Sequence, residues 1–180
     1  MSDTIIVGTL NFIPVNEALE LAAQPSRQVI QQYDYDVHVA PIDSAFSDTV
    51  AFCESYNVSL EHSANCVIVK AVRASNITYA AVMVIASSRI DINGAVRRAL
   101  NARKISFAPL DEATEMTGME FGGINPIGLP ADWQILVDTR VAKSESLVIG
   151  SGIRGSKFLV NGSFLANLPN ASILDLVKRG

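Results

Sequence analysis

Two glycine-rich segments are the features of this sequence best suited to chemistry. The first, residues 118–128, reads Gly-Met-Glu-Phe-Gly-Gly-Ile-Asn-Pro-Ile-Gly and lacks the Lys-Ser/Thr ending of a phosphate-binding P-loop. Its two successive glycines, Gly122 and Gly123, leave peptide N–H groups free to face a ligand oxygen, as an oxyanion site requires. Glycine and proline are also common in an ordinary connection between a helix and a strand. Composition alone leaves both interpretations of this segment open.

The second segment, residues 150–155, reads Gly-Ser-Gly-Ile-Arg-Gly and matches the GxGxxG pattern of dinucleotide-binding folds. Those folds need a helix to begin in the segment and an acidic residue about 20 residues later. Here Lys157 to Val160 is typical of a strand, and only 25 residues follow Gly155. A dinucleotide-binding fold is therefore rejected. We expect the glycines to let the backbone approach another strand or a ligand closely.

Side chains that usually form catalytic centres are scarce. His38 and His62 are the only histidines, and the metal-binding pattern HExxH does not occur. Ser151 stands in Gly-Ser-Gly and not in the GxSxG of a nucleophile elbow. Cys53 and Cys66 are predicted to be small core residues. The sequence thus predicts neither a metal site nor a cofactor.

The clearest predicted helix carries a cluster of basic residues. Asp91 is predicted to cap its N-terminus, and apolar residues recur at helical spacing as far as Leu100. The opposite face carries Arg97, Arg98 and Arg103. Such a face is usually only solvated, but it could also contact phosphates on an otherwise acidic protein.

Length and composition indicate one soluble domain. The chain has 180 residues, a net charge of −4, 49% apolar residues and 18% charged residues, which excludes general disorder. The longest apolar run, residues 79–86, is too short to cross a bilayer, and the N-terminus lacks the basic region of a signal peptide. We therefore expect a cytoplasmic protein without a membrane partner. The acidic balance argues against indiscriminate nucleic-acid binding, and the apolar content leaves room for a homodimer.

Hydrophobic periodicity predicts alternating strands and helices. Strands are predicted over 66–71, 79–86, 105–107, 134–137, 147–149 and 157–160, with an extended segment over 37–39. Helices are predicted over 15–23, 49–56, 92–100, 111–117 and 164–168. The polar turn at 73–76 indicates that the first two strands form an antiparallel hairpin. No break in composition divides the chain, so we predict a single domain over 1–180, of the α/β class in the mixed α+β sense, with a mixed sheet.

The order of these motifs resembles that of the YbaK/EbsC family, which is related to the editing domain inserted in bacterial prolyl-tRNA synthetases. A strand opening with Asn65-Cys66-Val67 leads to TGMEFGGINPIG at 117–128 and then to GSGIRG at 150–155. A short strand and a terminal helix follow. The similarity extends over about residues 37–176, and the pattern T-G-x-x-x-G-G-x-x-P-x-G is its most specific part. Residues 1–30 lie outside it.

The resemblance implies a compact, mixed and partly closed sheet with flanking helices around a pocket. It also implies hydrolysis of the ester that joins a wrong amino acid to tRNA, with alanine and cysteine as the expected acyl groups and tRNA as the partner. The implied catalytic candidates are Gly122 and Gly123, together with Asn65. The implied substrate-binding residues are Ile124, Asn125, Pro126, Gly150, Ser151 and Gly152. Candidates for contact with tRNA are Arg97, Arg98, Arg103, Arg154 and Lys157.

Asn65 is a departure from the family pattern. The family commonly begins this strand with a lysine that is important for activity, and Asn65 takes its place here. Lys70 lies five residues further, about 16 Å along a strand and on the opposite face, so it cannot substitute. Asparagine offers hydrogen bonds but no charge.

Three alternatives follow from this departure. The chain could belong to a branch that hydrolyses the ester with asparagine, with Arg154 or Lys157 supplying the missing charge. It could instead be a tRNA- or ligand-binding relative that has lost activity with the lysine. A third alternative is an esterase or amidase acting on a free small molecule.

Overall fold

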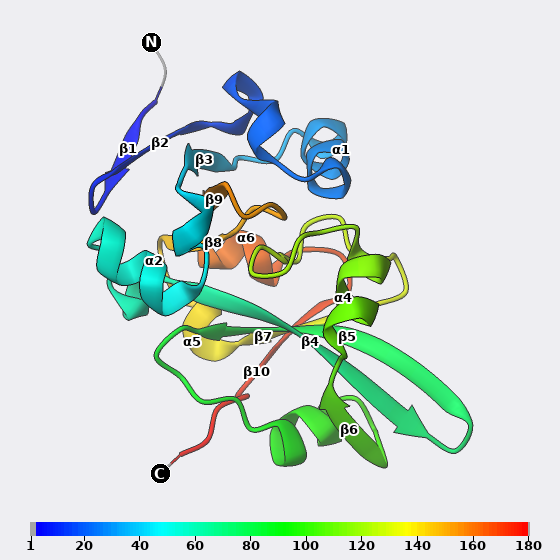
Figure 1. The fold of residues 1–180 in the computed structure, drawn as a ribbon. Helices are drawn as coiled ribbons and strands as arrows, with labels where there is room; N and C mark the ends of the chain where they lie inside the picture. The colour runs from blue at the N-terminus through cyan, green and yellow to red at the C-terminus, as the bar shows by residue number, and fades with distance from the viewer. Residues whose placement is uncertain (1–2, 180) are drawn as a thin grey trace.

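The computed structural model describes residues 3–179 and arranges their strands in two five-stranded sheets (Figure 1). The first sheet has the order β1-β2-β3-β9-β8 and is antiparallel throughout. Its strands are β1 Ile5–Val7, β2 Leu10–Pro14, β3 His38–Pro41, β9 Ser156–Val160 and β8 Leu147–Gly150.

The second sheet has the order β10-β7-β5-β4-β6 and is mixed, as predicted. Its strands are β10 Ala171–Leu174, β7 Gln134–Asp138, β5 Asn76–Ile85, β4 Ala64–Arg73 and β6 Lys104–Phe107. The β10–β7 and β7–β5 pairs are parallel, and the other pairs are antiparallel. β4 and β5 form the predicted hairpin, whose turn places Ala74 in the left-handed region at φ 54°.

The two sheets meet along one edge of β4. Near the start of β4, Ser63 forms a parallel bridge to Val148 of β8, while the far half of β4 pairs with β6 from Val69 to Val72. Between these contacts β8 and β6 diverge, so the middle of this edge pairs with no strand of residues 3–179. The sheet surface is therefore curved and partly closed, with a gap in its strand pairing between the Ser63 bridge and Val69.

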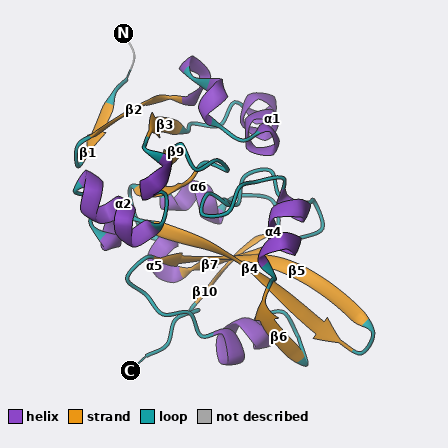
Figure 2. Ribbon diagram, in the orientation of Figure 1, coloured by secondary structure: helices purple, strands orange, loops and turns teal. Residues whose placement is uncertain are grey.

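Short helices cover the sheets (Figure 2). They are α1 Gln24–Tyr33, α2 Thr49–Tyr56, α3 Arg97–Ala99, α4 Leu110–Thr117, α5 Thr139–Ala142 and α6 Gly162–Ala166. A wide π-helical turn over Ile92–Val96 precedes α3, and Asp91 caps it by accepting from the N–H groups of Gly94 and Ala95. α4 ends at Gly118 with φ +67°, the left-handed conformation in which glycine commonly ends a helix. None of the helices in residues 3–179 is long and apolar enough to span a membrane.

The main hydrophobic core lies between the sheets. It joins Val39 and Phe158 of the first sheet to Ile68, Met83 and Val137 of the second. A separate cluster covers the other face of the second sheet, where Val69 packs with Val96 and Leu176. Residues of opposite parity on β4 thus face two different environments, which explains its nearly continuous apolar sequence.

The N-terminal prediction is wrong in part. Residues 15–23 do not form a helix, because Val15–Glu17 and Leu19–Leu21 are single 3₁₀ turns and the first α-helix begins at Gln24. Pro25 lies in the first turn of this helix, where proline is well tolerated because an N–H group there has no partner within the helix. The helix predicted over 164–168 is confirmed as α6, but the strands β1, β2 and β10 were not predicted.

Candidate active site

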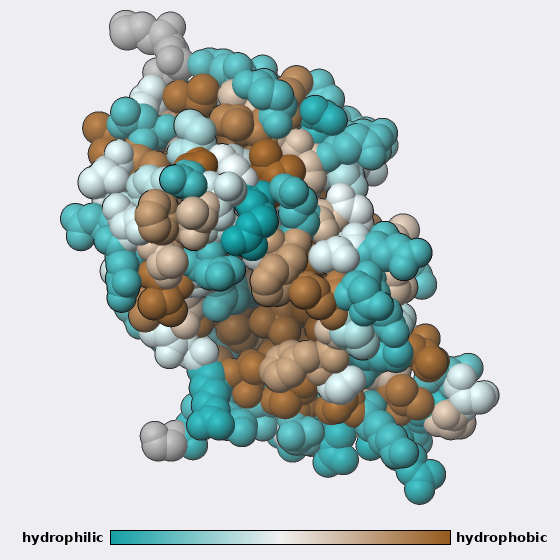
Figure 3. Space-filling view, in the orientation of Figure 1, coloured by the Kyte–Doolittle hydropathy of each residue, from teal (hydrophilic) through white to brown (hydrophobic). Residues whose placement is uncertain are grey.

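A pocket of about 470 Å³ opens at the gap beside β4. Its walls come from the start of β4, the start of α2, α4, the glycine-rich loop after α4, and the facing ends of β8 and β9. Figure 3 shows a hollow with apolar residues around it near the middle of this face. The volume falls within the range of small-molecule sites, about 300–1,000 Å³.

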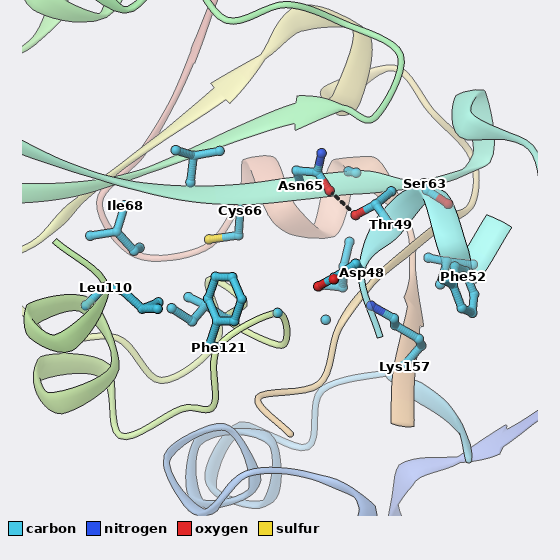
Figure 4. Close-up of a pocket in the computed structure, with 18 of the residues that line it drawn as sticks. Asp48, Thr49, Phe52, Ser63, Asn65, Cys66, Ile68, Leu110, Phe121 and Lys157 are labelled. Atoms are coloured by element: carbon cyan, nitrogen blue, oxygen red, sulfur yellow. Dashed lines mark hydrogen bonds between the residues drawn. The ribbon is translucent and has the colours of Figure 1, made fainter. Parts of the chain in front are cut away.

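One end of the pocket is apolar. Cys66 and Ile68 of β4 face Leu110 at the start of α4 and Phe121 of the loop after it (Figure 4). Ala113 and Ile124 complete this wall. Leu110 and Phe121 are about half exposed, so they form a rim that a ligand could cover. This end suits an apolar side chain or the flat face of a base.

The other end of the pocket is polar. Asp48 and Thr49 at the start of α2 lie opposite Asn65 and Ser63, with Lys157 of β9 across from them (Figure 4). The Thr49 hydroxyl donates to Asn65 Oδ1 at 2.6 Å, which fixes the orientation of the amide. The Asn65 NH₂ group has no protein partner among residues 3–179, so it is free to donate to a ligand.

Lys157 is inside the pocket and not on the molecular surface. Lys157 is 6% exposed, and its Nζ donates to the Ser47 carbonyl oxygen at 2.8 Å. The ammonium also lies 5.1 Å from the centroid of the Phe52 ring, within range of a cation–π contact. Burial lowers the pKa of Lys157 to about 8.

The backbone of Cys66 adds a donor and an acceptor. On β4 the even-numbered residues direct their backbone groups away from β5, as shown by the bonds from Arg103 N–H to Val72 O and from Ala108 N–H to Ile68 O. The N–H and C=O of Cys66 therefore point to the same edge, at the gap between β8 and β6. This open stretch of strand could bind an amide or ammonium group in the pocket.

The glycine-rich loop enters the pocket through Gly122 and Ile124. Gly123 lies behind them, where its N–H donates to Glu120 O at 3.0 Å and its C=O accepts from Gly152 N–H at 2.6 Å. Within residues 3–179 the N–H groups of Gly122 and Ile124 have no hydrogen-bond partner. The donors that this loop leaves free are thus those of Gly122 and Ile124, not that of Gly123.

The two glycine motifs of the sequence pack directly on one another. A Cβ atom on Gly150 would lie 2.3 Å from Gly123 O, and one on Gly123 would lie 2.8 Å from Ile153 O. Gly152 adopts φ +90°, which favours glycine, and rests against Ala23. Gly150 itself lines the pocket. The close approach expected of these glycines is therefore between the motifs.

Several of the predicted substrate-binding residues support the pocket from behind. Asn125 is buried, where its Oδ1 accepts from Ile127 N–H and its Nδ2 donates to Ser26 Oγ. The buried Ser151 hydroxyl bonds to Ser156, and none of Asn125, Pro126, Ser151 and Gly152 is among the residues that line the pocket. Their structural effect is to hold the lining residues in place.

The predicted basic residues separate into two groups. The Arg154 guanidinium donates to the carbonyl oxygens of Phe121 and Ser44, so it ties the glycine-rich loop to the segment before α2. Arg97, Arg98 and Arg103 are exposed, but they follow the turn that packs Val96 on the face of the second sheet opposite to the pocket. They are therefore placed to contact only a ligand that extends beyond the pocket.

Some lining residues were not predicted from the sequence. Asp48 and Thr49 begin a correctly predicted helix, but nothing in their local pattern separates a ligand-facing N-terminus from an ordinary one. Phe121 stands beside two glycines in the glycine-rich motif, and a large aromatic side chain in such a loop could have indicated contact with a ligand. No group of three or more His, Cys, Asp and Glu side chains within residues 3–179 could hold a metal ion.

Cys66 is expected to be a poor nucleophile in spite of its place in the pocket. Burial raises the pKa of its thiol well above the ordinary value, so the thiol stays protonated at neutral pH. Iodoacetamide should alkylate Cys66 in the native protein at least about tenfold more slowly than in the urea-unfolded chain, as measured by peptide mass spectrometry. Equal rates in the two states would contradict this prediction.

Comparison with known proteins places the fold and the pocket in one family. The family model described as the aminoacyl-tRNA editing domain matches residues 43–168, which include every residue that lines the pocket. No curated protein sequence matches the chain.

Solved structures share the fold. A proposed trans-editing enzyme for prolyl-tRNA synthetase superposes with a TM-score of 0.74 at 15% identity, over 87% of this chain and 97% of that one. The hypothetical protein APE2540 superposes with a TM-score of 0.76 at 17% identity, over 86% and 100% of the two chains. The expected mixed, partly closed sheet is thus confirmed, and the chain belongs to the aminoacyl-tRNA editing domain family.

Proposed function

We propose that the protein is a trans-editing deacylase that hydrolyses the ester bond of mischarged aminoacyl-tRNA. The observation that carries the proposal is the pocket beside β4, which combines an apolar end with free hydrogen-bond donors at the other end. An aminoacyl ester needs both kinds of surface, because its side chain is often apolar and its carbonyl oxygen becomes negatively charged during hydrolysis.

The pocket suggests how the ester would lie. The amino-acid side chain would occupy the end formed by Cys66, Ile68 and Ala113, and the α-ammonium would donate to the open Cys66 carbonyl. The ester carbonyl would then lie toward Asn65 and the free N–H groups of Gly122 and Ile124. Asn65, fixed by Thr49, would orient the ester through its free NH₂ group.

Hydrolysis in this pocket does not need a protein nucleophile. An aminoacyl ester is already reactive, so positioning it and stabilising the oxyanion can supply the acceleration. A water molecule or the neighbouring ribose hydroxyl would handle the proton. The protonated thiol of Cys66 agrees with such a mechanism.

The test is a panel of mischarged tRNAs incubated with the purified protein and with an Asn65→Ala variant. The first members of the panel are proline tRNA mischarged with alanine and proline tRNA mischarged with cysteine. They come first because a structural neighbour is described as a proposed trans-editing enzyme for prolyl-tRNA synthetase. Hydrolysis of one or two members, reduced in the variant, is the expected result. Equally rapid hydrolysis of aminoacyl-adenosine would favour an esterase acting on small molecules.

If the protein binds tRNA but hydrolyses no member of the panel, the result would favour the non-catalytic alternative. The observation behind that alternative is Asn65 itself, which stands where the family commonly has a lysine and brings no charge to the pocket.

The cluster of Arg97, Arg98 and Arg103 should contribute to tRNA affinity. Replacement of all three residues by alanine removes three cations from an exposed segment, so affinity should fall and its dependence on salt should weaken by about two to three units of log–log slope. Filter binding over a salt series measures both quantities. Unchanged affinity at low salt would show that tRNA does not reach this side of the second sheet.

A further inference from the structure

Lys157 is the one lysine in residues 3–179 that is buried, and its surroundings leave it incompletely bonded. An ammonium has three protons to donate, and the Ser47 carbonyl oxygen accepts one of them at 2.8 Å. No carboxylate of the described chain lies within 4.0 Å of Nζ. Burying a charge with a single partner is unfavourable, so an additional oxygen from a ligand would be bound strongly.

Ser47 holds the lysine beside the glycine-rich loop. Its carbonyl oxygen accepts from Lys157 Nζ, and its hydroxyl donates to the Gly122 carbonyl oxygen at 3.2 Å. Ser47 is itself buried, so both bonds are protected from water. Ser47 thus links Lys157 to Gly122, and both residues line the pocket, with Lys157 at its polar end (Figure 4).

The charged and titratable groups around Lys157 leave it cationic at neutral pH. Burial disfavours the protonated form most strongly and Arg154 adds to this effect, while Cys53 of α2 and Asp48, the N-cap residue of that helix, favour the protonated form. The balance lowers the pKa to about 8, so most of the protein carries the charge at pH 7.

This inference rests on the proposed deacylase function. We propose that Lys157 is a catalytic residue whose ammonium donates a hydrogen bond to the ester carbonyl oxygen as negative charge develops on it. The cation that Asn65 does not provide on β4 is supplied from β9, on the other side of the pocket.

The step is a simple hydrolysis. The water oxygen forms a bond to the acyl carbon, the carbonyl oxygen takes the negative charge, and Lys157 stabilises it without giving up a proton. The carbonyl double bond then re-forms as the bond from the acyl carbon to the ribose oxygen breaks. One proton of the water goes to the ribose oxygen, and the other leaves with the amino acid. Water is the only co-reactant.

The experiment compares Lys157→Met and Lys157→Arg with the native protein. In the methionine variant kcat for deacylation should fall by about 100- to 1,000-fold, the usual effect of removing an oxyanion donor, with a smaller change in KM. The arginine variant should recover part of the rate, and its rate should persist above pH 8, where the native enzyme loses the charge on Lys157. Lys70→Met is the matched control, because Lys70 pairs with Glu112 outside the pocket.

Binding of two analogues separates charge stabilisation from packing. One is a phosphonate that carries negative charge in place of the ester carbonyl, and the other is a neutral 3′-amide of adenosine. Lys157→Met should weaken binding of the phosphonate at least about tenfold and leave binding of the amide nearly unchanged.

Three results would overturn the proposal. If Lys157→Met hydrolyses as fast as the native protein, Lys157 is not catalytic although the deacylase function stands. If both analogues lose the same affinity, the lysine only shapes the pocket. If the native protein neither hydrolyses the panel nor binds either analogue, the deacylase function fails and the role of Lys157 fails with it.

Discussion

Replacing Gly123 by alanine is expected to lower the rate of deacylation by about 100-fold or more. The added Cβ would lie 2.8 Å from Ile153 O and 3.0 Å from the Ile153 N and C atoms. All three neighbours are backbone atoms, which cannot rotate out of the way, so the two glycine motifs must move apart. A shift of about 1 Å would displace Gly122 and Ile124 from the ester, and misplacement of that size is enough for such a loss.

The same motif supplies a matched control for Gly123→Ala. A Cβ on Gly155 would meet nothing within 4 Å, and this glycine does not have a positive φ, so Gly155→Ala should fold and hydrolyse like the native protein. Single-turnover deacylation gives the rates, and circular dichroism verifies that each variant is folded. Native activity in a folded Gly123→Ala variant would show that the position of this loop does not control hydrolysis.

The strands around the pocket were predictable because their local pattern and their burial agree. β4, β5, β7, β8 and β9 are runs of β-branched and other apolar residues, and each lies within two or three residues of its predicted bounds. The N-terminal strand β1 is only three residues long and mostly exposed, and β2 ends at Pro14. Their pairing depends on β3 and β9 from distant parts of the chain, which periodicity cannot show.

The site was predictable as a set of loops but not as a set of facing side chains. The motifs correctly identified the segments that meet, yet Gly122, Ile124 and Gly150 line the pocket whereas Asn125 and Ser151 lie behind it. Which residue of a loop faces a ligand depends on its φ and ψ angles and on its packing. Motif spacing carries neither kind of information.

Motif spacing likewise does not show whether a charged side chain such as that of Lys157 faces the pocket or the surface. From the sequence, Lys157 was a candidate for contact with tRNA and, as an alternative to Arg154, for supplying the charge that Asn65 lacks. It stands in a strand, Ser156–Val160, whose five residues are all buried, and its side chain lines the pocket. A lysine inside a doubly buried strand is the signal that could have identified it.

Lys157→Met is also expected to make the folded protein more stable at neutral pH. The pKa of Lys157 is about 8 in the folded protein, against 10.5 for an ordinary lysine. Between these values the unfolded chain binds more protons than the folded one, so the stability of the native protein rises with pH across this window. Below about pH 8 the native protein bears the full cost of the buried charge, about 3 kcal/mol, and methionine does not have that cost.

The measurement is the difference in unfolding free energy between the native protein and the variant, from urea titrations at several pH values. The advantage of Lys157→Met should be largest at and below pH 8 and should disappear near pH 10.5. Lys70→Met is a control for which we expect the opposite effect, a loss of stability at neutral pH. The hydrogen bond that Lys70 donates to Glu112 raises the pKa of Lys70, so this lysine stabilises the protein at neutral pH and loses its contribution only as the pH rises above the ordinary lysine value.

The two effects of Lys157→Met, taken together, distinguish a catalytic lysine from a structural one. Replacing a lysine that only supported the fold would lower both stability and activity. Replacing a cation that is kept in a pocket for its effect on the substrate should lower activity but raise stability, because the buried charge is unfavourable until a ligand oxygen contacts it. A variant that loses stability at pH 7 would therefore contradict the burial of an incompletely bonded charge at this position.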